Sequence, residues 1–208
     1  MRVVSYLVTD NFCAEIDRVI QSAHAAGFST WLPNKGEVGS SIYEGMGFWG
    51  EHALMVRSLM KAMGGPVIPN TLYFRATNTD TERAYIHSDR ESGANTCVCY
   101  LTDHADEYGT AFYRHKPTGL LEMPSFAAMR EAGTFDELKA DMVSRDPDKW
   151  EQVDFVRGRK NRALIFPAPM FHSRLPTGGF GDSPETARIV WVSHFYRIGD
   201  ALPGDCNG

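Results

Sequence analysis

The chain has 208 residues, a formal net charge of −5 and 43% hydrophobic side chains, which suits one domain with a sizeable core over residues 1–208. The negative charge argues against binding to nucleic acid or to anionic membranes, because both are themselves negatively charged. No apolar stretch is long enough to span a membrane, the N-terminus lacks the apolar core of a signal peptide, and the four cysteines form no disulfide framework, so we expect a cytoplasmic protein.

A strand and two helices are predicted in the first third of the chain. Residues 3–8 favour the strand, and Asp10 or Asn11 can cap a helix that ends near Gly27. A second helix is predicted over residues 50–63, because its apolar side chains recur at helical spacing. These side chains are Met55, Val56, Leu59, Met60 and Met63.

Strand-like segments dominate residues 71–200, with one insertion over residues 125–148. Residues 134–137 form a capping box, so a helix is predicted over residues 135–144 of the insertion. Strands in this order, with helices mostly on one side, favour a mostly β fold with supporting helices. We therefore predict a double-stranded β-helix, which is a jelly-roll or cupin-like barrel, with residues 1–70 as its support.

The clearest functional motif is His87-Ser88-Asp89, which is followed far downstream by His172. Alternate residues of a strand point to one face, so the first and third residues of the motif can bind one metal ion together. His172 follows residues 162–167, an apolar run typical of a buried strand. Two histidines and one carboxylate form the facial triad of non-haem Fe(II) sites. Other histidines, such as His104 and His115 in turn-like sequence, are expected to be solvated.

A buried arginine is predicted on the last long strand. Arg188 opens the apolar run of residues 188–195, and a buried arginine needs an anionic partner because an unpaired buried charge is costly. A dicarboxylate co-substrate would supply that partner. Arg174 is the rival, because it shares a strand face with His172, but the apolar surroundings favour Arg188. His194 shares the strand face of Arg188, and we interpret it as a hydrogen-bonded core histidine.

The order of these motifs resembles that of the 2-oxoglutarate- and Fe(II)-dependent oxygenases, and within them the prolyl-hydroxylase-like branch. The resemblance covers about residues 71–197. Three further segments carry the resemblance beyond the metal motif and Arg188. Residues 96–103 resemble a strand with a Tyr-Leu pair, and residues 109–113 resemble a "GG-x-x-x-F" strand. Residues 161–172 resemble the strand that delivers the distal histidine.

Two features depart from the family pattern. Arg188 lies further from His172 than the corresponding arginine does in the family, and residues 176–184, dense in turn formers, account for the extra length. Only Gly109 stands where the family often has two glycines.

The resemblance implies Fe(II) as the metal and 2-oxoglutarate as the co-substrate, with ascorbate as a candidate addition. His87, Asp89 and His172 would hold the metal, while Arg188 and the hydroxyl of Tyr100 would hold the far carboxylate of 2-oxoglutarate. In such enzymes 2-oxoglutarate is decarboxylated to succinate as the substrate is oxidised. Related halogenases have a small residue where this chain has Asp89, so the carboxylate favours hydroxylation or a related oxidation.

Two alternatives stay open. A cupin-type metalloenzyme that does not use 2-oxoglutarate would keep the three ligands but give Arg188 no role. A non-catalytic jelly-roll binding module would expose aromatic side chains such as Trp31 and Trp49 to a ligand. The substrate, whether a small molecule or a peptidyl side chain, has no recognisable signature. Residues 31–49 and 125–148 are the segments that we expect to shape its pocket.

Overall fold

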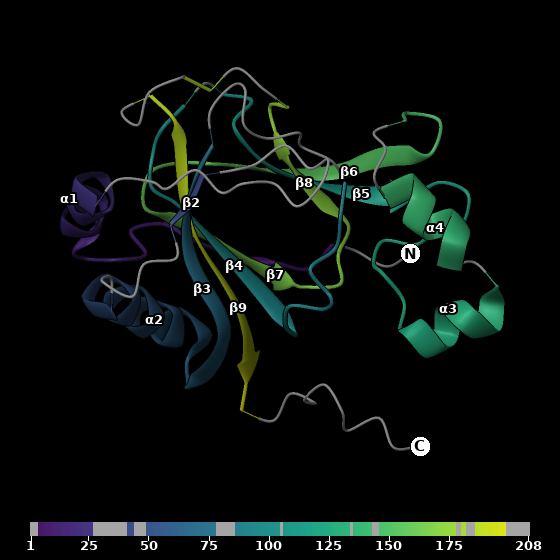
Figure 1. Cartoon of the computed structure of the whole chain (residues 1–208), viewed down its shortest axis with the longest axis horizontal. Coiled ribbons are helices and arrows are strands. Elements are labelled where there is room, and N and C mark those ends of the chain that lie inside the picture. Colours follow the sequence, from purple (N-terminus) through teal and green to yellow (C-terminus); the bar gives the residue numbers. More distant parts are fainter. Residues whose placement is uncertain are drawn as a thin grey trace.

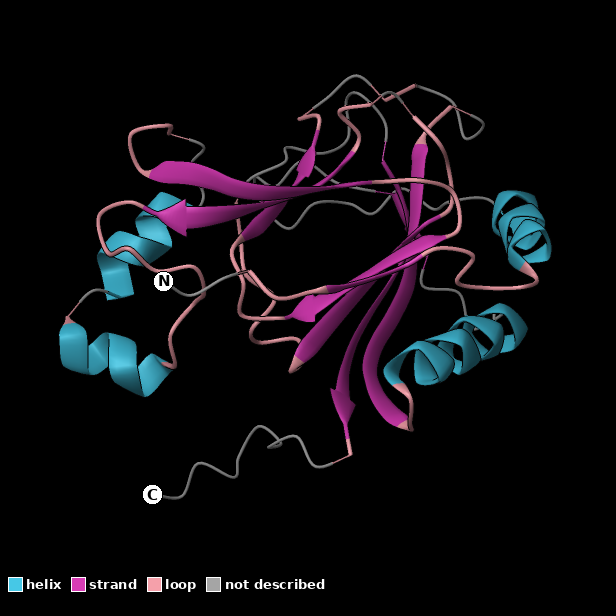
Figure 2. Cartoon of the chain, turned by 180° about the vertical axis from the view of Figure 1, so that it is seen from behind, coloured by secondary structure: helices cyan, strands magenta, loops and turns pink. Residues whose placement is uncertain are grey.

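The computed structural model of the chain describes residues 4–26, 41–43, 49–77, 86–104, 106–133, 135–142, 146–177, 180–181 and 186–198. Its strands are β1 (Leu7–Thr9), β2 (Ser41–Tyr43), β3 (Val67–Thr77), β4 (Asn95–Tyr100), β5 (Gly109–His115), β6 (Trp150–Arg157), β7 (Arg162–Pro167), β8 (His172–Leu175) and β9 (Arg188–Arg197). They form one sheet of six strands, in the order β1-β7-β4-β9-β3-β2, and one of three strands, in the order β6-β5-β8. The two sheets lie as two layers, with helices outside them (Figures 1 and 2).

All strand pairs in both sheets are antiparallel. The structure confirms a mostly β protein with supporting helices. The described strands form two separate sheets rather than one closed barrel, so the jelly-roll topology stays a prediction. The single domain over residues 1–208 is also still a prediction. In the described part of the chain, no helix is long and apolar enough to cross a membrane.

Helices α1 (Ile16–Ala26) and α2 (Trp49–Met63) cover the outer face of the six-stranded sheet (Figure 1). Their apolar sides join the main hydrophobic core, where Val19, Met55 and Leu59 are fully buried. The second helix begins one residue before its predicted start and ends where the sequence predicted, because Gly64 follows with a positive φ of 69°.

The first helix begins later than predicted. Neither Asp10 nor Asn11 caps it, because the chain after them is bound to a distant turn. The backbone N–H groups of Phe12 and Cys13 donate to the carbonyl oxygen and the side-chain oxygen of Asn161, at 3.0 and 2.8 Å. This pairing holds the start of the segment out of the helix, which is a tertiary contact that local sequence does not reveal.

The insertion contains two helices rather than one. Helix α3 (Phe126–Ala132) was not predicted; Ser125 caps its N-terminus by accepting from the N–H of Ala128, and Gly133 ends it with a left-handed φ of 66°. Helix α4 (Phe135–Met142) matches the predicted helix over the described residues. Thr134 of the predicted capping box and residues 143–144 of the predicted helix lie outside the described residues.

The two insertion helices pack behind the segments that carry the metal motif. Met129 of α3 and Leu138 of α4 are fully buried in one cluster with Ile86 and Phe171. Ile86 and Phe171 immediately precede the two motif histidines in sequence, so the insertion supports the backbone on which those histidines stand.

The prediction that His115 is solvated is wrong. His115 ends β5 and is fully buried. Its two ring nitrogens lie 2.8 Å from Thr118 Oγ1 and 3.0 Å from Asp141 Oδ2, so it connects β5 to helix α4. A buried polar ring needs such partners, and the one on α4 comes from a distant part of the chain.

Candidate active site

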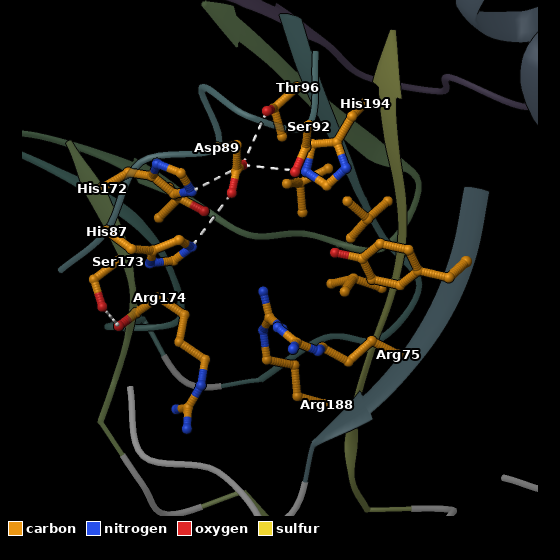
Figure 3. Close-up of a pocket in the computed structure, with 15 residues that line it drawn as sticks. Arg75, His87, Asp89, Ser92, Thr96, His172, Ser173, Arg174, Arg188 and His194 are labelled. Carbon is orange, nitrogen blue, oxygen red and sulfur yellow. Dashed lines mark hydrogen bonds and ion pairs between the residues drawn. The ribbon is translucent and has the colours of Figure 1, made fainter. Parts of the chain in front are cut away.

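A cavity of about 270 Å³ lies between the two sheets and holds every predicted metal ligand (Figure 3). One side is lined by alternate residues of β3, β4 and β9, and the other by residues of β5 and β8. Strand periodicity explains this division, because successive residues of a strand point to opposite faces. Tyr73 and Arg75 face the cavity, for example, while Phe74 between them lies in the main core.

The backbone brings the two motif histidines together. His87 and His172 form an isolated antiparallel bridge, in which each N–H donates to the other's carbonyl oxygen, at 3.0 and 2.9 Å. Their rings consequently lie side by side, with centroids 4.3 Å apart. The N–H of Asp89 donates to the carbonyl oxygen of Ala168 at 2.9 Å, which keeps Asp89 beside the same strand connection. One ligand atom from each of the three side chains lies within 4.8 Å of the others.

The two carboxylate oxygens of Asp89 have different surroundings. Oδ1 lies 3.6 Å from His87 Nε2, whereas Oδ2 lies 3.4 Å from His172 Nε2 and 3.3 Å from His194 Nε2. The hydroxyl of Thr96 also donates to Oδ2, at 2.9 Å. Burial alone would raise the pKa of Asp89, but the neighbouring histidines outweigh it and hold that pKa well below its usual range.

Met170 fixes the orientation of the His172 ring, because its carbonyl oxygen lies 2.9 Å from Nδ1. A carbonyl oxygen only accepts, so Nδ1 carries a proton, which leaves Nε2 as the nitrogen that can coordinate an ion once its own proton is lost. Burial would lower the pKa of His172, but the charge and hydrogen bond of Asp89, helped by Met170, raise it. A bound cation would replace the contact between Asp89 and His172 with direct bonds from both side chains to the ion.

Arg188 enters the cavity from the start of β9 and is 5% exposed. Its guanidinium carbon lies 5.8 Å from the ring centre of Tyr108, and its Nε is buried without a hydrogen-bond partner. Arg75 projects into the same cavity from the neighbouring strand, and Figure 3 shows the two guanidinium groups converging below the histidines. An orphaned donor and a second cation together fit an anionic ligand.

Arg174 also lines the cavity but points away from the cluster of histidines in Figure 3. Its Nη1 donates to the carbonyl oxygen of Pro176 at 2.8 Å, and its guanidinium carbon lies 5.2 Å from the ring centre of Phe180. These contacts occupy Arg174 near its own strand and favour Arg188 as the anion-binding residue.

Tyr100 is fully buried and is not among the cavity-lining side chains. Its hydroxyl lies 2.7 Å from Thr110 Oγ1, and Thr110 does line the cavity. Burial raises the pKa of Tyr100 to about 12, against the opposing effects of the Thr110 hydrogen bond and the charge of Arg188. The phenol therefore stays neutral, and its direct neighbour is Thr110.

Sequence reasoning did not assign a role to Arg75 or Thr96, and it did not connect His194 with the metal motif. Arg75 has a period-two signal, because it alternates with apolar residues between Tyr73 and Thr77. The contacts of Thr96 and His194 with Asp89 depend on the pairing of separate strands, which local sequence does not encode.

The donor set has the chemistry of a non-haem iron site. Two imidazole nitrogens and one carboxylate oxygen, clustered on one side of a cavity, match the facial triad used for Fe(II). The orphaned Arg188 Nε in the same cavity matches a carboxylate co-substrate. The residues present thus fit both groups.

The fold is similar to that of several solved structures. The non-haem α-ketoglutarate-dependent epimerase SnoN from nogalamycin biosynthesis is 14% identical, with a TM-score of 0.56 over 99% of this chain and 87% of SnoN. HygX from Streptomyces hygroscopicus, solved with nickel, 2-oxoglutarate and hygromycin B, is 12% identical, with a TM-score of 0.58 over 99% of this chain and 90% of HygX. AviO1 from Streptomyces viridochromogenes is 14% identical, with a TM-score of 0.53 over 97% and 93% of the two chains.

Sequence comparisons add one family. The model of a family of unknown function, DUF6445, matches residues 74–193, which is more than half of the chain and includes all three clustered side chains. No curated protein matches the sequence.

Proposed function

We propose that this chain, which belongs to the DUF6445 family of unknown function, is an Fe(II)- and 2-oxoglutarate-dependent oxygenase. One observation carries the proposal: a single cavity contains the His87, Asp89 and His172 cluster together with the buried, orphaned Nε of Arg188. The first group suits a metal and the second suits a carboxylate. A 2-oxo dicarboxylate needs both.

Each residue has a distinct task in this proposal. His87, Asp89 and His172 would hold the ion, which supplies oxygen activation and a chelation point for the 2-oxo acid. Arg188 would bind the distal carboxylate with charge-assisted hydrogen bonds, aided by the nearby Arg75. Thr110 offers its hydroxyl to the same ligand, and Tyr100 holds that hydroxyl in place.

The cavity walls also contribute some apolar surface. Val98, Val190 and Val192 line it between the polar groups. Apolar walls lower the local dielectric, which strengthens the contact between Arg188 and a carboxylate. The structure of HygX with nickel and 2-oxoglutarate supports the choice of co-substrate, because the two chains share a fold.

Finer points belong to the same proposal. We infer a hydroxylase of the prolyl-hydroxylase-like branch, with the jelly-roll topology of one domain, acting in the cytoplasm on a small molecule or a peptidyl side chain. Asp89 supports hydroxylation, because a halide-binding site would need a smaller residue there. Ascorbate would serve to keep the iron reduced during assays.

Anaerobic addition of Fe(II) and then 2-oxoglutarate to the purified protein tests the proposal. We expect a visible charge-transfer band from the chelate, and slow succinate formation once oxygen and ascorbate are admitted. Asp89→Ala and His172→Ala should lose both signals, because each removes one of three ligands. His24→Ala, on helix α1 outside the cavity, is the matched control and should retain both.

The two alternatives predict other outcomes. A cupin-type metalloenzyme would bind iron but give neither the band nor succinate. A binding module would give no iron binding at all. Either result from the wild-type protein would refute the proposed function.

A further inference from the structure

Asp89 is held by a pair of residues from neighbouring strands. Thr96 on β4 and His194 on β9 lie directly opposite each other in the sheet register. Thr96 Oγ1 donates to Asp89 Oδ2 at 2.9 Å, and His194 Nε2 lies 3.3 Å from the same oxygen. Thr96 is 1% exposed and His194 6%, so water competes little for these contacts.

The contacts of His194 indicate which of its two ring nitrogens carries the proton. A carboxylate oxygen only accepts hydrogen bonds, so His194 Nε2 carries the hydrogen. Nδ1 lies 2.5 Å from the hydroxyl of Thr71, which is opposite His194 on β3. In the neutral ring Nδ1 accepts from that hydroxyl, so Thr71 of β3 and His194 of β9 form one chain of polar contacts that ends on Asp89 Oδ2, and Thr96 of β4 donates to the same oxygen.

His194 is not itself one of the clustered ligands. In the described part of the chain, the group able to hold a metal ion contains His87, Asp89 and His172 alone. His194 reaches this group only through Asp89. His194 therefore contacts a metal ligand, Asp89, but would not itself bind the ion.

We propose that His194 is a positioning residue for the metal centre, which together with Thr96 holds Oδ2 of Asp89 and so fixes the orientation in which this carboxylate meets the ion. Two donors on one oxygen restrict the rotation of the carboxylate. The restriction would keep the carboxylate directed toward His87 and His172 and leave the other positions on the ion for co-substrate and oxygen. This inference rests on the metal centre proposed above.

Co(II) binding without co-substrate is the test, because its visible d–d bands report the coordination of the ion independently of turnover. His194→Leu should raise the Co(II) dissociation constant by about 10- to 100-fold, as other losses of a ligand's hydrogen-bond partner do, and should change the bands. His194→Gln should restore most of both, because its amide N–H can reach Asp89. If His194→Leu does not fold, Thr96→Val removes the other donor with little change of shape and should act in the same direction.

His52→Leu is the matched control. His52 is a buried histidine, 7% exposed, that accepts a hydrogen bond from Trp191 Nε1 at 3.0 Å on the opposite face of β9. Its loss should lower the melting temperature without changing the Co(II) bands or affinity.

The outcomes separate the inference from the proposed function. Wild-type protein that binds no Co(II) would refute the metal centre and this inference together. Normal Co(II) affinity and bands in both His194→Leu and Thr96→Val would overturn the inference alone. The same would follow if His52→Leu changed the bands as much as His194→Leu, because the effect would then be structural.

Discussion

The two faces of strand β9 show how one segment serves fold and chemistry separately. Ile189, Trp191 and Phe195 face helices α1 and α2 and belong to the main core. Arg188 and His194, on the other face, line the cavity with the metal motif. The division follows from the two-residue period of a strand. A substitution on one face should therefore change stability, and a substitution on the other should change ligand binding.

Trp191→Ala gives the largest expected effect on the core face. The side chain is fully buried and donates to His52, so its loss should lower the free energy of unfolding by about 3–5 kcal/mol. Chemical denaturation measures this change. At low temperature, the folded fraction should still form the Fe(II)–2-oxoglutarate band with wild-type affinity. A weakened band would mean that the two faces are coupled.

Arg188→Met should weaken co-substrate binding while leaving the stability of the fold almost unchanged. We expect the dissociation constant of 2-oxoglutarate to rise roughly 10- to 100-fold, because charge-assisted hydrogen bonds to the distal carboxylate are lost. Co(II) affinity and the melting temperature should change little. Anaerobic titration of the chelate band measures the affinity. Arg174→Met is the control. If Arg174→Met lost 2-oxoglutarate affinity to this extent and Arg188→Met did not, Arg174 would be the residue that binds the carboxylate.

Tyr100→Phe should show the smallest effect. The hydroxyl contacts Thr110 rather than the cavity, so its removal should weaken 2-oxoglutarate binding by only about fivefold, the value of one net hydrogen bond. Thr110→Val tests the same connection from the cavity side. If Tyr100→Phe matched Arg188→Met in size, Tyr100 would have to touch the co-substrate directly.

Features that depend on one segment could be predicted from the sequence. His87 and Asp89 line the same cavity, as their alternate spacing predicts, and the burial of Arg188 at the start of β9 follows from its apolar run. The roles of these residues stay proposals. Helix α2 was predicted nearly to the residue from its apolar stripe. In each example the signal and the structure lie within the same few residues.

Features that depend on contacts between distant segments could not be predicted. The late start of helix α1 results from hydrogen bonds to Asn161, and the burial of His115 results from Asp141 on another element. The role of His194 depends on the register of β3, β9 and β4. Register is set by the assembled sheet, and a one-residue shift would reverse every face.

The backbone bridge between His87 and His172 has a consequence for the whole fold. An ion bound there would connect two segments far apart in the chain, and the unfolded chain would lack this arrangement of ligands. Binding to the folded state alone adds stability by mass action, about 2.7 kcal/mol when the free ion is at a hundred times its dissociation constant. The lifetime of this protein in a cell would then follow the supply of iron as well as its own sequence.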